Sequence, residues 1–245
     1  MSDLQNYGPE KRTTRRDFAK EQLLLVCLLV VLTSAMFIKW PALDLSFSRL
    51  FFDGQSFPLA RNAALQKLRS LTDVIGAVIL VTSFFLICHR PSRDYLGIPI
   101  RDLLVPFIAY GIGAGLIVES VLKEFIGRAR PRSILEFGGS NLFTVPWQMS
   151  DACQSNCSFS SGEAAGAMAM FSILAMIPKG PARILACLVM TFLTIMLGLN
   201  RIAFGAHFLS DVLISMLVII AVILAARILV HSLHIDLAQS DEVQE

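Results

Sequence analysis

The sequence predicts an all-helical integral membrane protein with about six transmembrane helices in one bundle. Its 245 residues are 55% hydrophobic and only 16% charged, whereas a soluble domain carries about 25% charged residues. A helix needs roughly 20 apolar residues to cross a bilayer core. Six segments come close to that length: 22–39, 71–88, 103–122, 164–177, 182–199 and 208–230.

The six segments differ in how strongly their composition predicts a transmembrane helix. The last is the clearest, because residues 212–230 are interrupted only by Ser215 and Arg227. Residues 74–88 and 164–177 are short in strictly apolar content. We interpret both as spans that polar residues extend at one end. The alternative is a buried helix that does not cross the membrane.

Positive charge ahead of the first span sets the predicted topology. Five cations crowd the N-terminus: Lys11, Arg12, Arg15, Arg16 and Lys20. Cytoplasmic segments of membrane proteins carry an excess of Lys and Arg, so this end is expected in the cytoplasm. Six spans return the C-terminus to the same side. Segments 123–163 and 200–207 are then expected together on the opposite side of the membrane.

The predicted division of the chain follows from this topology. A basic cytoplasmic tail covers residues 1–20, a transmembrane domain covers 21–235, and an acidic cytoplasmic tail covers 236–245. The polar lead is too long for a cleaved signal peptide, and no small-residue cleavage pattern ends the apolar run. We interpret the first span as a retained anchor.

Three cations at the ends of apolar segments are predicted to bind an anion. Lys123 ends the third span, Arg130 follows seven positions later, and Arg201 comes from a separate turn. The planar fork of arginine suits phosphate oxygens, and lysine adds a point charge. Converging cations without carboxylate partners are costly unless an anion fills the space between them. Arg128 and Arg132 are instead expected to meet lipid headgroups.

The run from Ser160 to Glu163 leads into the apolar segment 164–177. Backbone amides at a helix N-terminus bind anions, and a glycine lets the backbone come close to the ligand. Ser161 and Gly162 are therefore candidate phosphate-binding positions. Ser160 and Glu163 also match the Ser-x-x-Glu capping box that starts helices. The phosphate-site and cap interpretations are compatible for Ser161 and Gly162, but they compete for Glu163.

A histidine and an aspartate are predicted to form the reactive centre. His207 opens the sixth span and Asp211 lies four residues on, so both are expected on one face of a helix. A carboxylate there can keep one ring nitrogen protonated and aim the other outward, as a nucleophilic imidazole requires. An aspartate within a membrane helix usually has a functional partner. The alternative is a His–Asp pair in which the two side chains only satisfy each other's hydrogen bonds.

Two of the five cysteines stand close together in the long loop before the fourth span. Cys153 and Cys157 have no histidine or third cysteine nearby to complete a zinc site. An extracytoplasmic compartment favours disulfides, so a Cys153–Cys157 bridge is expected, with two free thiols as the alternative.

Taken together, these motifs resemble the three-part signature of the type 2 phosphatidic acid phosphatase superfamily. The resemblance covers residues 103–230 and rests on Lys-x6-Arg-Pro, Ser-Gly before a helix, and Arg-x5-His-x3-Asp. It implies a phosphatase with a six-helix membrane core that needs no metal or other cofactor. By position, His207 becomes phosphohistidine and Asp211 orients it. The implied phosphate-binding residues are Lys123, Arg130, Ser161, Gly162 and Arg201.

The sequence departs from that signature at two positions. The family usually has Pro-Ser-Gly-His and Ser-Arg, where this chain has Ser160 to Glu163 and Asn200-Arg201. The replaced histidine is the one expected to protonate the leaving oxygen. Glu163 can take that role only if desolvation keeps it protonated. Phosphoryl transfer depends mainly on positioning and charge stabilisation, so a weaker acid need not abolish turnover.

The resemblance implies a lipid phosphatase in a bacterial inner membrane, with its active site facing the periplasm. The run from Asn156 to Glu163 looks most like that of enzymes that remove the 4′- or 1-phosphate of lipid A. Undecaprenyl diphosphate and phosphatidylglycerophosphate are alternative substrates. A lipid phosphotransferase and a non-catalytic lipid-binding protein are alternatives of another class. The expected partners are the bilayer and a membrane phospholipid or lipid A, and no nucleic acid.

Overall fold

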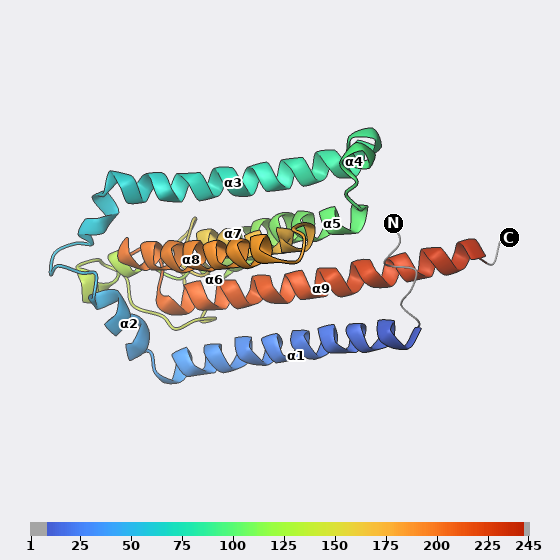
Figure 1. Ribbon diagram of the computed structural model, residues 1–245. Helices are drawn as coiled ribbons and strands as arrows, with labels where there is room; N and C mark the ends of the chain where they lie inside the picture. The colour runs from blue at the N-terminus through green and yellow to red at the C-terminus, as the bar shows by residue number, and fades with distance from the viewer. Residues whose placement is uncertain (1–8, 243–245) are drawn as a thin grey trace.

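The computed structural model describes residues 9–242, and its regular elements are helices (Figure 1). An isolated bridge between Ile134 and Asn141 is the only β pairing within that range. The labelled helices, in chain order, are α1 (Pro9–Lys39), α2 (Ala42–Arg49), α3 (Ala63–Cys88), α4 (Arg90–Leu96), α5 (Ile100–Ile108), α6 (Lys123–Ile126), α7 (Gly162–Ala169), α8 (Pro181–Ala203) and α9 (Leu209–Glu242).

Two of these helices continue in other helical geometries. A π-helical stretch, Ala109–Leu122, joins α5 to α6, so these three elements form one long rod. A 3₁₀ stretch, Met170–Met176, extends α7. π-Helical turns are uncommon and frequently occur near functional sites.

Five helices in the described part of the chain are long and apolar enough to cross a membrane. They are Asp17–Lys39, Ala63–Cys88, Ile100–Ser133, Pro181–Ala203 and Leu209–Ser232. These helices coincide with five of the six predicted spans, including the one over residues 71–88. The sixth, Gly162–Met176, is a shorter apolar helix. Its α and 3₁₀ rises give a length of about 26 Å, slightly less than the roughly 30 Å of a bilayer core. Its crossing of the membrane stays a prediction.

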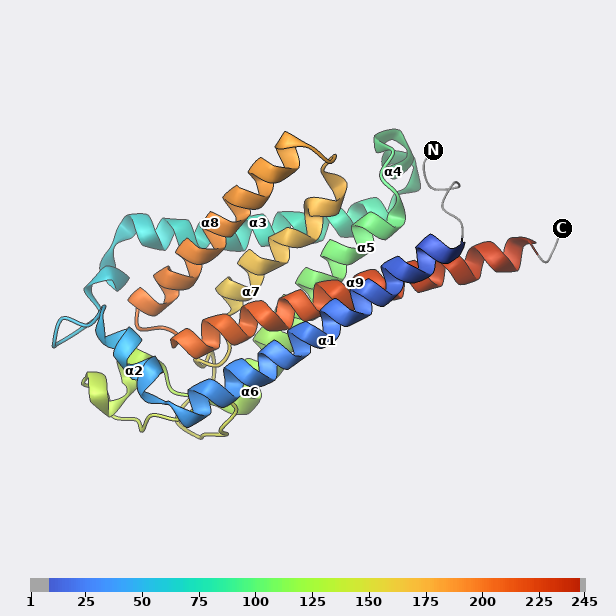
Figure 2. The ribbon, with the colours of Figure 1, turned by 60° about the horizontal axis from the view of Figure 1, so that its bottom comes forward.

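The short helix α7 lies at the centre of the bundle. It packs against α3, α8, α9 and the π-helical stretch, and Figure 2 shows it between α8 and α5. Its inward face is built of fully buried alanines, which let the neighbouring helices approach closely. By contrast, α1, α3 and α8 expose large apolar side chains such as Leu24, Val81 and Phe192. An apolar surface of this extent suits contact with lipid rather than water.

The two ends of the bundle carry different elements (Figures 1 and 2). The start of α1, the end of α9 and helix α4 lie at one end. Helix α2, helix α6 and the long connection 127–161 lie at the other, together with the turn between α8 and α9. The two segments predicted to carry the site, 123–163 and 200–207, therefore share one end of the bundle.

The predicted tails fall partly within the described residues. Helix α1 begins at Pro9 and α9 continues to Glu242, so residues 9–20 and 236–242 extend the first and last helices. Residues 1–8 and 243–245 lie outside the described range. The division of the chain into two tails and one domain stays a prediction.

The connection 127–161 is irregular but firmly anchored. It starts at Gly127, whose φ of +61° suits glycine and whose Cα faces the Ser150 carbonyl so closely that any side chain would clash. The amide of Ser150 donates to the Ile126 carbonyl at 2.9 Å. Cys153 and Cys157 are joined, which confirms the predicted disulfide. The segment that leads into α7 is therefore held in place.

Candidate active site

His207 lies in the turn between α8 and α9 and is fully buried. Its ring Nδ1 is 2.6 Å from the backbone carbonyl oxygen of Ser158. Because a carbonyl can only accept a hydrogen bond, Nδ1 carries the proton and a neutral ring keeps its lone pair on Nε2. That Nε2 has no hydrogen-bond partner, and Oε2 of the Glu163 carboxylate lies 3.7 Å away.

The surroundings of His207 favour its neutral form. Burial lowers the pKa of the His207 ring, and the neighbouring Glu163 carboxylate opposes that shift only in part. The ring is therefore neutral near pH 7. A neutral imidazole with a protonated Nδ1 and an unpaired Nε2 is the state that a nitrogen nucleophile needs.

Asp211 lies beside His207 but does not hold its ring directly. One oxygen, Oδ2, accepts from the hydroxyl of Ser158 at 2.6 Å and from the amide of Phe208 at 2.9 Å. Ser158 in turn offers its carbonyl to His207. The expected pairing assumed that both residues share one helical face, but α9 begins at Leu209, after the histidine. The link from Asp211 to the imidazole therefore runs through Ser158.

Arg128 is buried completely, so the prediction that it meets lipid headgroups is wrong. Its Nη2 is 2.9 Å from the Asp44 carboxylate, and its Nη1 contacts both Asp211 and the hydroxyl of Ser210. Its Nε donates to the Thr144 carbonyl at 2.8 Å. No local sequence pattern indicates this pairing, because Asp44 lies 84 residues away on α2.

Asp44 ties α2 to the first turn of α9. The amide and the hydroxyl of Ser210 donate to its two carboxylate oxygens, at 2.8 and 2.6 Å. Asp44, Arg128, Ser210 and Asp211 are all fully buried. We call these four residues the buried ion network. Through Asp211 and Ser158, it fixes the turn that carries His207 to the connection 127–161.

The start of α7 does not form the predicted capping box. Ser161 is the N-cap, and its hydroxyl accepts from the amide of Ala164 at 3.4 Å. Ser160, the expected cap, has a buried hydroxyl without a hydrogen-bond partner. The amide of Ser161 donates to Ser215 at 2.8 Å. Gly162 leaves room for Glu119, whose Oε1 would lie 1.4 Å from a Cβ at that position.

Glu163 extends into a cluster of cations instead of capping the helix. Its Oε1 is 2.9 Å from Nε of Arg69 and 3.3 Å from Nη2 of Arg201. Its Oε2 has no hydrogen-bond partner and faces His207. Two adjacent guanidinium groups stabilise the ionised carboxylate, so Glu163 is poorly suited to donate a proton.

The three predicted cations come together near this point. Lys123 is buried, and its Nζ is 2.7 and 2.9 Å from the two oxygens of Glu119. Arg130 donates from Nη2 to both the carbonyl and the side-chain oxygen of Asn156, at 2.6 and 2.7 Å. Arg201 is 3% exposed, and its Nε and Nη1 have no partner. Buried guanidinium donors without acceptors are costly, so they favour an anionic ligand.

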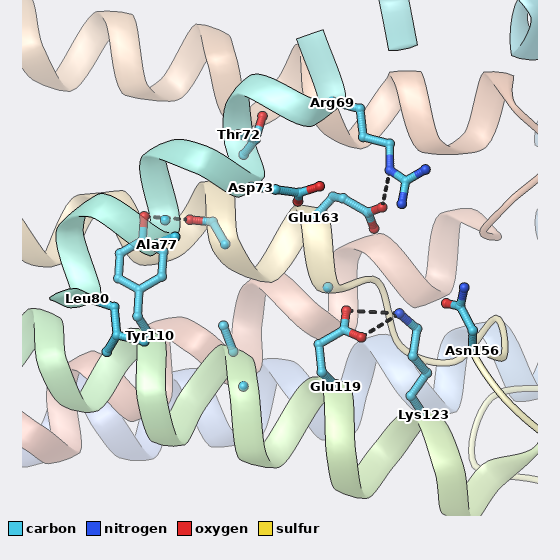
Figure 3. A pocket seen from close by; sticks show the side chains of 15 residues that line it. Arg69, Thr72, Asp73, Ala77, Leu80, Tyr110, Glu119, Lys123, Asn156 and Glu163 are labelled. Carbon is cyan, nitrogen blue, oxygen red and sulfur yellow. Dashed lines mark hydrogen bonds and ion pairs between the residues drawn. The ribbon is translucent and has the colours of Figure 1, made fainter. Parts of the chain in front are cut away.

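Two adjoining cavities open beside these side chains. One, of about 520 Å³, lies among α3, α7 and the π-helical stretch, and its lining includes Lys123, Glu119 and Glu163 (Figure 3). The other, of about 400 Å³, is strongly cationic. Its charged lining residues are Arg69, Arg130, Arg132 and Arg201. Asn156 and Arg69 line both cavities.

The sequence reasoning missed Arg69 and Asp73, which face these cavities from α3. The available signal was an arginine and an aspartate one helical turn apart at the polar end of an apolar segment. Figure 3 shows both side chains directed toward Glu163.

The buried ion network yields a prediction about stability. Arg128→Met should lower the free energy of unfolding by about 3–5 kcal/mol, because it leaves two buried carboxylates without their cation. Denaturant titration of the protein in detergent measures this change. Arg132→Met, at an exposed position, is the control and should change stability by no more than about 0.5 kcal/mol. Equal stability of the two variants would contradict the structural role given to Arg128.

Sequence comparison identifies relatives of this chain and its family. The chain is 33% identical over 210 residues to a lipid A 4′-phosphatase of Rhizobium leguminosarum, covering 78% of this chain and 90% of that protein. It is 32% identical over 237 residues to a lipid A 4′-phosphatase of Rhizobium etli, covering 89% and 91%. A lipid A 4′-phosphatase of Francisella tularensis subsp. novicida is 35% identical over 101 residues, or 41% and 46% of the two chains. No solved structure matched the chain. The model of the PAP2 superfamily matches residues 104–234, and the chain belongs to that family.

Proposed function

We propose that this phosphatase removes the 4′-phosphate of lipid A through a phosphohistidine at His207. The observation that carries the chemistry is the unpaired Nε2 of His207, which faces the same Glu163 carboxylate as the buried, partly unpaired guanidinium of Arg201. The choice of lipid A rests on the Rhizobium relatives, which bear that name and align over about nine-tenths of their length.

The first step forms an N–P bond. Nε2 of His207 attacks phosphorus, and the bond from phosphorus to the sugar oxygen breaks. Positive charge develops on the ring and is shared with the Ser158 carbonyl through Nδ1–H. Asp211 acts through Ser158, whose hydroxyl it holds. Its carboxylate fixes the position of the acceptor rather than touching the imidazole.

Cations hold the phosphoryl oxygens during this step. Lys123, Arg130 and Arg201 converge on the cavities and supply positive charge where the transition state carries negative charge. The amide of Ser161 is engaged with Ser215. We therefore infer that Ser161 acts mainly as the helix cap and that Gly162 brings the backbone close to the phosphate.

The leaving oxygen must gain a proton, and the geometry does not favour Glu163 as its source. Arg69 and Arg201 stabilise the carboxylate form of Glu163. We infer that a water molecule protonates the sugar oxygen. In the second step, water attacks the phosphohistidine, the N–P bond breaks, and inorganic phosphate leaves with the imidazole regenerated.

We place the site at the periplasmic face of the inner membrane. The support is the cluster of basic residues near the start of α1, at the opposite end of the bundle from His207. A cysteine introduced at the exposed position Ser140 tests this. It should react with a membrane-impermeant maleimide in spheroplasts, and reaction only after permeabilisation would contradict this orientation.

Mass spectrometry of lipid A tests the activity and its position. The purified protein should release free phosphate and convert lipid A to the form without the 4′-phosphate. His207→Ala should reduce the rate by about a thousandfold or more. His89→Ala, at the N-cap of α4 at the opposite end of the bundle, is the matched control and should retain the rate. Loss of the 1-phosphate, or phosphate passed to a second lipid, would refute the proposed reaction. Full turnover by His207→Ala would refute the nucleophile.

The lowered pKa of His207 predicts the pH profile. Attack requires the neutral ring, and a lowered pKa keeps the ring neutral to a lower pH than the ordinary value of about 6.5. We expect protonation of His207 to lower kcat/KM only below about pH 6.5. The second ionisation of the substrate phosphate, near pH 6, is measured separately by ³¹P NMR. An acid limb above pH 7 would contradict a buried, neutral His207.

A further inference from the structure

Arg69 belongs to none of the motifs that define the site, yet it reaches the site from α3. Its Nε is 2.9 Å from Oε1 of Glu163, and it lines both cavities (Figure 3). Its side chain is 47% exposed, so it can move without disrupting the core. Arg69 therefore supplies a mobile cation to a cluster that already contains Arg201 and Arg130.

The charges around this cluster are unevenly matched. Four arginines line the cationic cavity, and no carboxylate is among the described residues of its lining. Glu163, at its border, is shared between Arg69 and Arg201. Even so, Nε and Nη1 of Arg201 remain buried without acceptors. One carboxylate does not satisfy these donors, whereas a phosphate with three free oxygens offers more acceptors.

Glu163 occupies the place where a phosphate must bind. Its Oε2 is 3.7 Å from Nε2 of His207, and neither atom has a hydrogen-bond partner. A nucleophile attacks from about 3–3.5 Å, so a phosphoryl group must come at least as close to Nε2 as this carboxylate does. The two anions would repel each other, and they compete for the same guanidinium of Arg201.

We propose that Glu163 is an internal counter-ion that the substrate phosphate replaces, and that Arg69 then becomes a fourth phosphate-binding cation. The inference builds on the proposed function, since it assumes that phosphate binds next to His207. On binding, the Glu163 carboxylate withdraws from Arg201 while Arg69 and Arg201 turn their donors to the phosphoryl oxygens. The glutamate at the position of the usual family histidine thus regulates phosphate affinity.

Isothermal titration of inorganic phosphate into the full-length protein in detergent tests this without any turnover. Arg69→Met should raise the Kd about tenfold, because one charge-assisted contact is lost. Glu163→Gln should lower the Kd about tenfold, because the competing charge is removed. Lys67→Met, an exposed cation on the same helix, is the control and should leave the Kd unchanged. Melting temperatures of all variants confirm that they are folded.

The double variant separates direct binding from an indirect effect. If Arg69 contacts the phosphate, Arg69→Met should still weaken binding about tenfold when Glu163 is already glutamine. If Arg69 only holds Glu163 in place, the second substitution has no effect and the fourth-ligand role is wrong. Arg69→Lys should bind phosphate more tightly than Arg69→Met, because lysine keeps the positive charge but lacks the paired N–H donors of a guanidinium group.

Other outcomes test this inference separately from the proposed function. Unchanged phosphate affinity in Arg69→Met, or weaker binding in Glu163→Gln, would overturn the inference even if lipid A is hydrolysed. If the phosphate affinities change as expected but lipid A is not hydrolysed, the inference about Glu163 and Arg69 is supported and only the proposed substrate is refuted. Phosphate binding that is undetectable in both the wild type and Glu163→Gln would also overturn it.

Discussion

The interaction on which the site depends is the burial of the Arg128 guanidinium between Asp44 and Asp211. A buried ion pair is costly to desolvate and is maintained only where its geometry and hydrogen bonds are nearly complete. Here Ser210 and the Thr144 carbonyl complete them. The network joins α2, the connection 127–161 and the start of α9, which are distant in sequence. It therefore aligns the separate segments that the reaction needs.

The same atoms that satisfy this network also position the nucleophile. Asp211 binds Arg128 with one oxygen and Ser158 with the other, and Ser158 holds the ring of His207. Because Arg128, Asp211, Ser158 and His207 are all buried, the imidazole has little freedom to turn. Glu119 and Glu163 neutralise only part of the positive charge at this end of the bundle, through ion pairs with Lys123 and Arg201.

The sequence predicted the features that depend on local pattern. Apolar length identified five helices that are long and apolar enough to cross a membrane, and the compartment argument predicted the disulfide. Lys123, Arg130, Arg201 and His207 were correctly placed at one end of the bundle. Contacts between distant segments could not be read from spacing, as with Arg128 and Asp44. The spacing of His207 and Asp211 predicts a shared helical face, which is wrong because the helix begins after the histidine. Glu163 resembled a helix cap because its ion-pair partners, on α3 and α8, cannot be recognised from local sequence.

The central claim is that Nε2 of His207 carries the phosphoryl group, and trapping of the intermediate tests it most directly. Enzyme quenched in alkali during turnover of ³²P-labelled lipid A is digested and mapped by mass spectrometry. The account predicts an acid-labile, alkali-stable phosphate on His207 that is absent from His207→Ala. A phosphate on another residue, or label that persists when His207 is replaced, would contradict it.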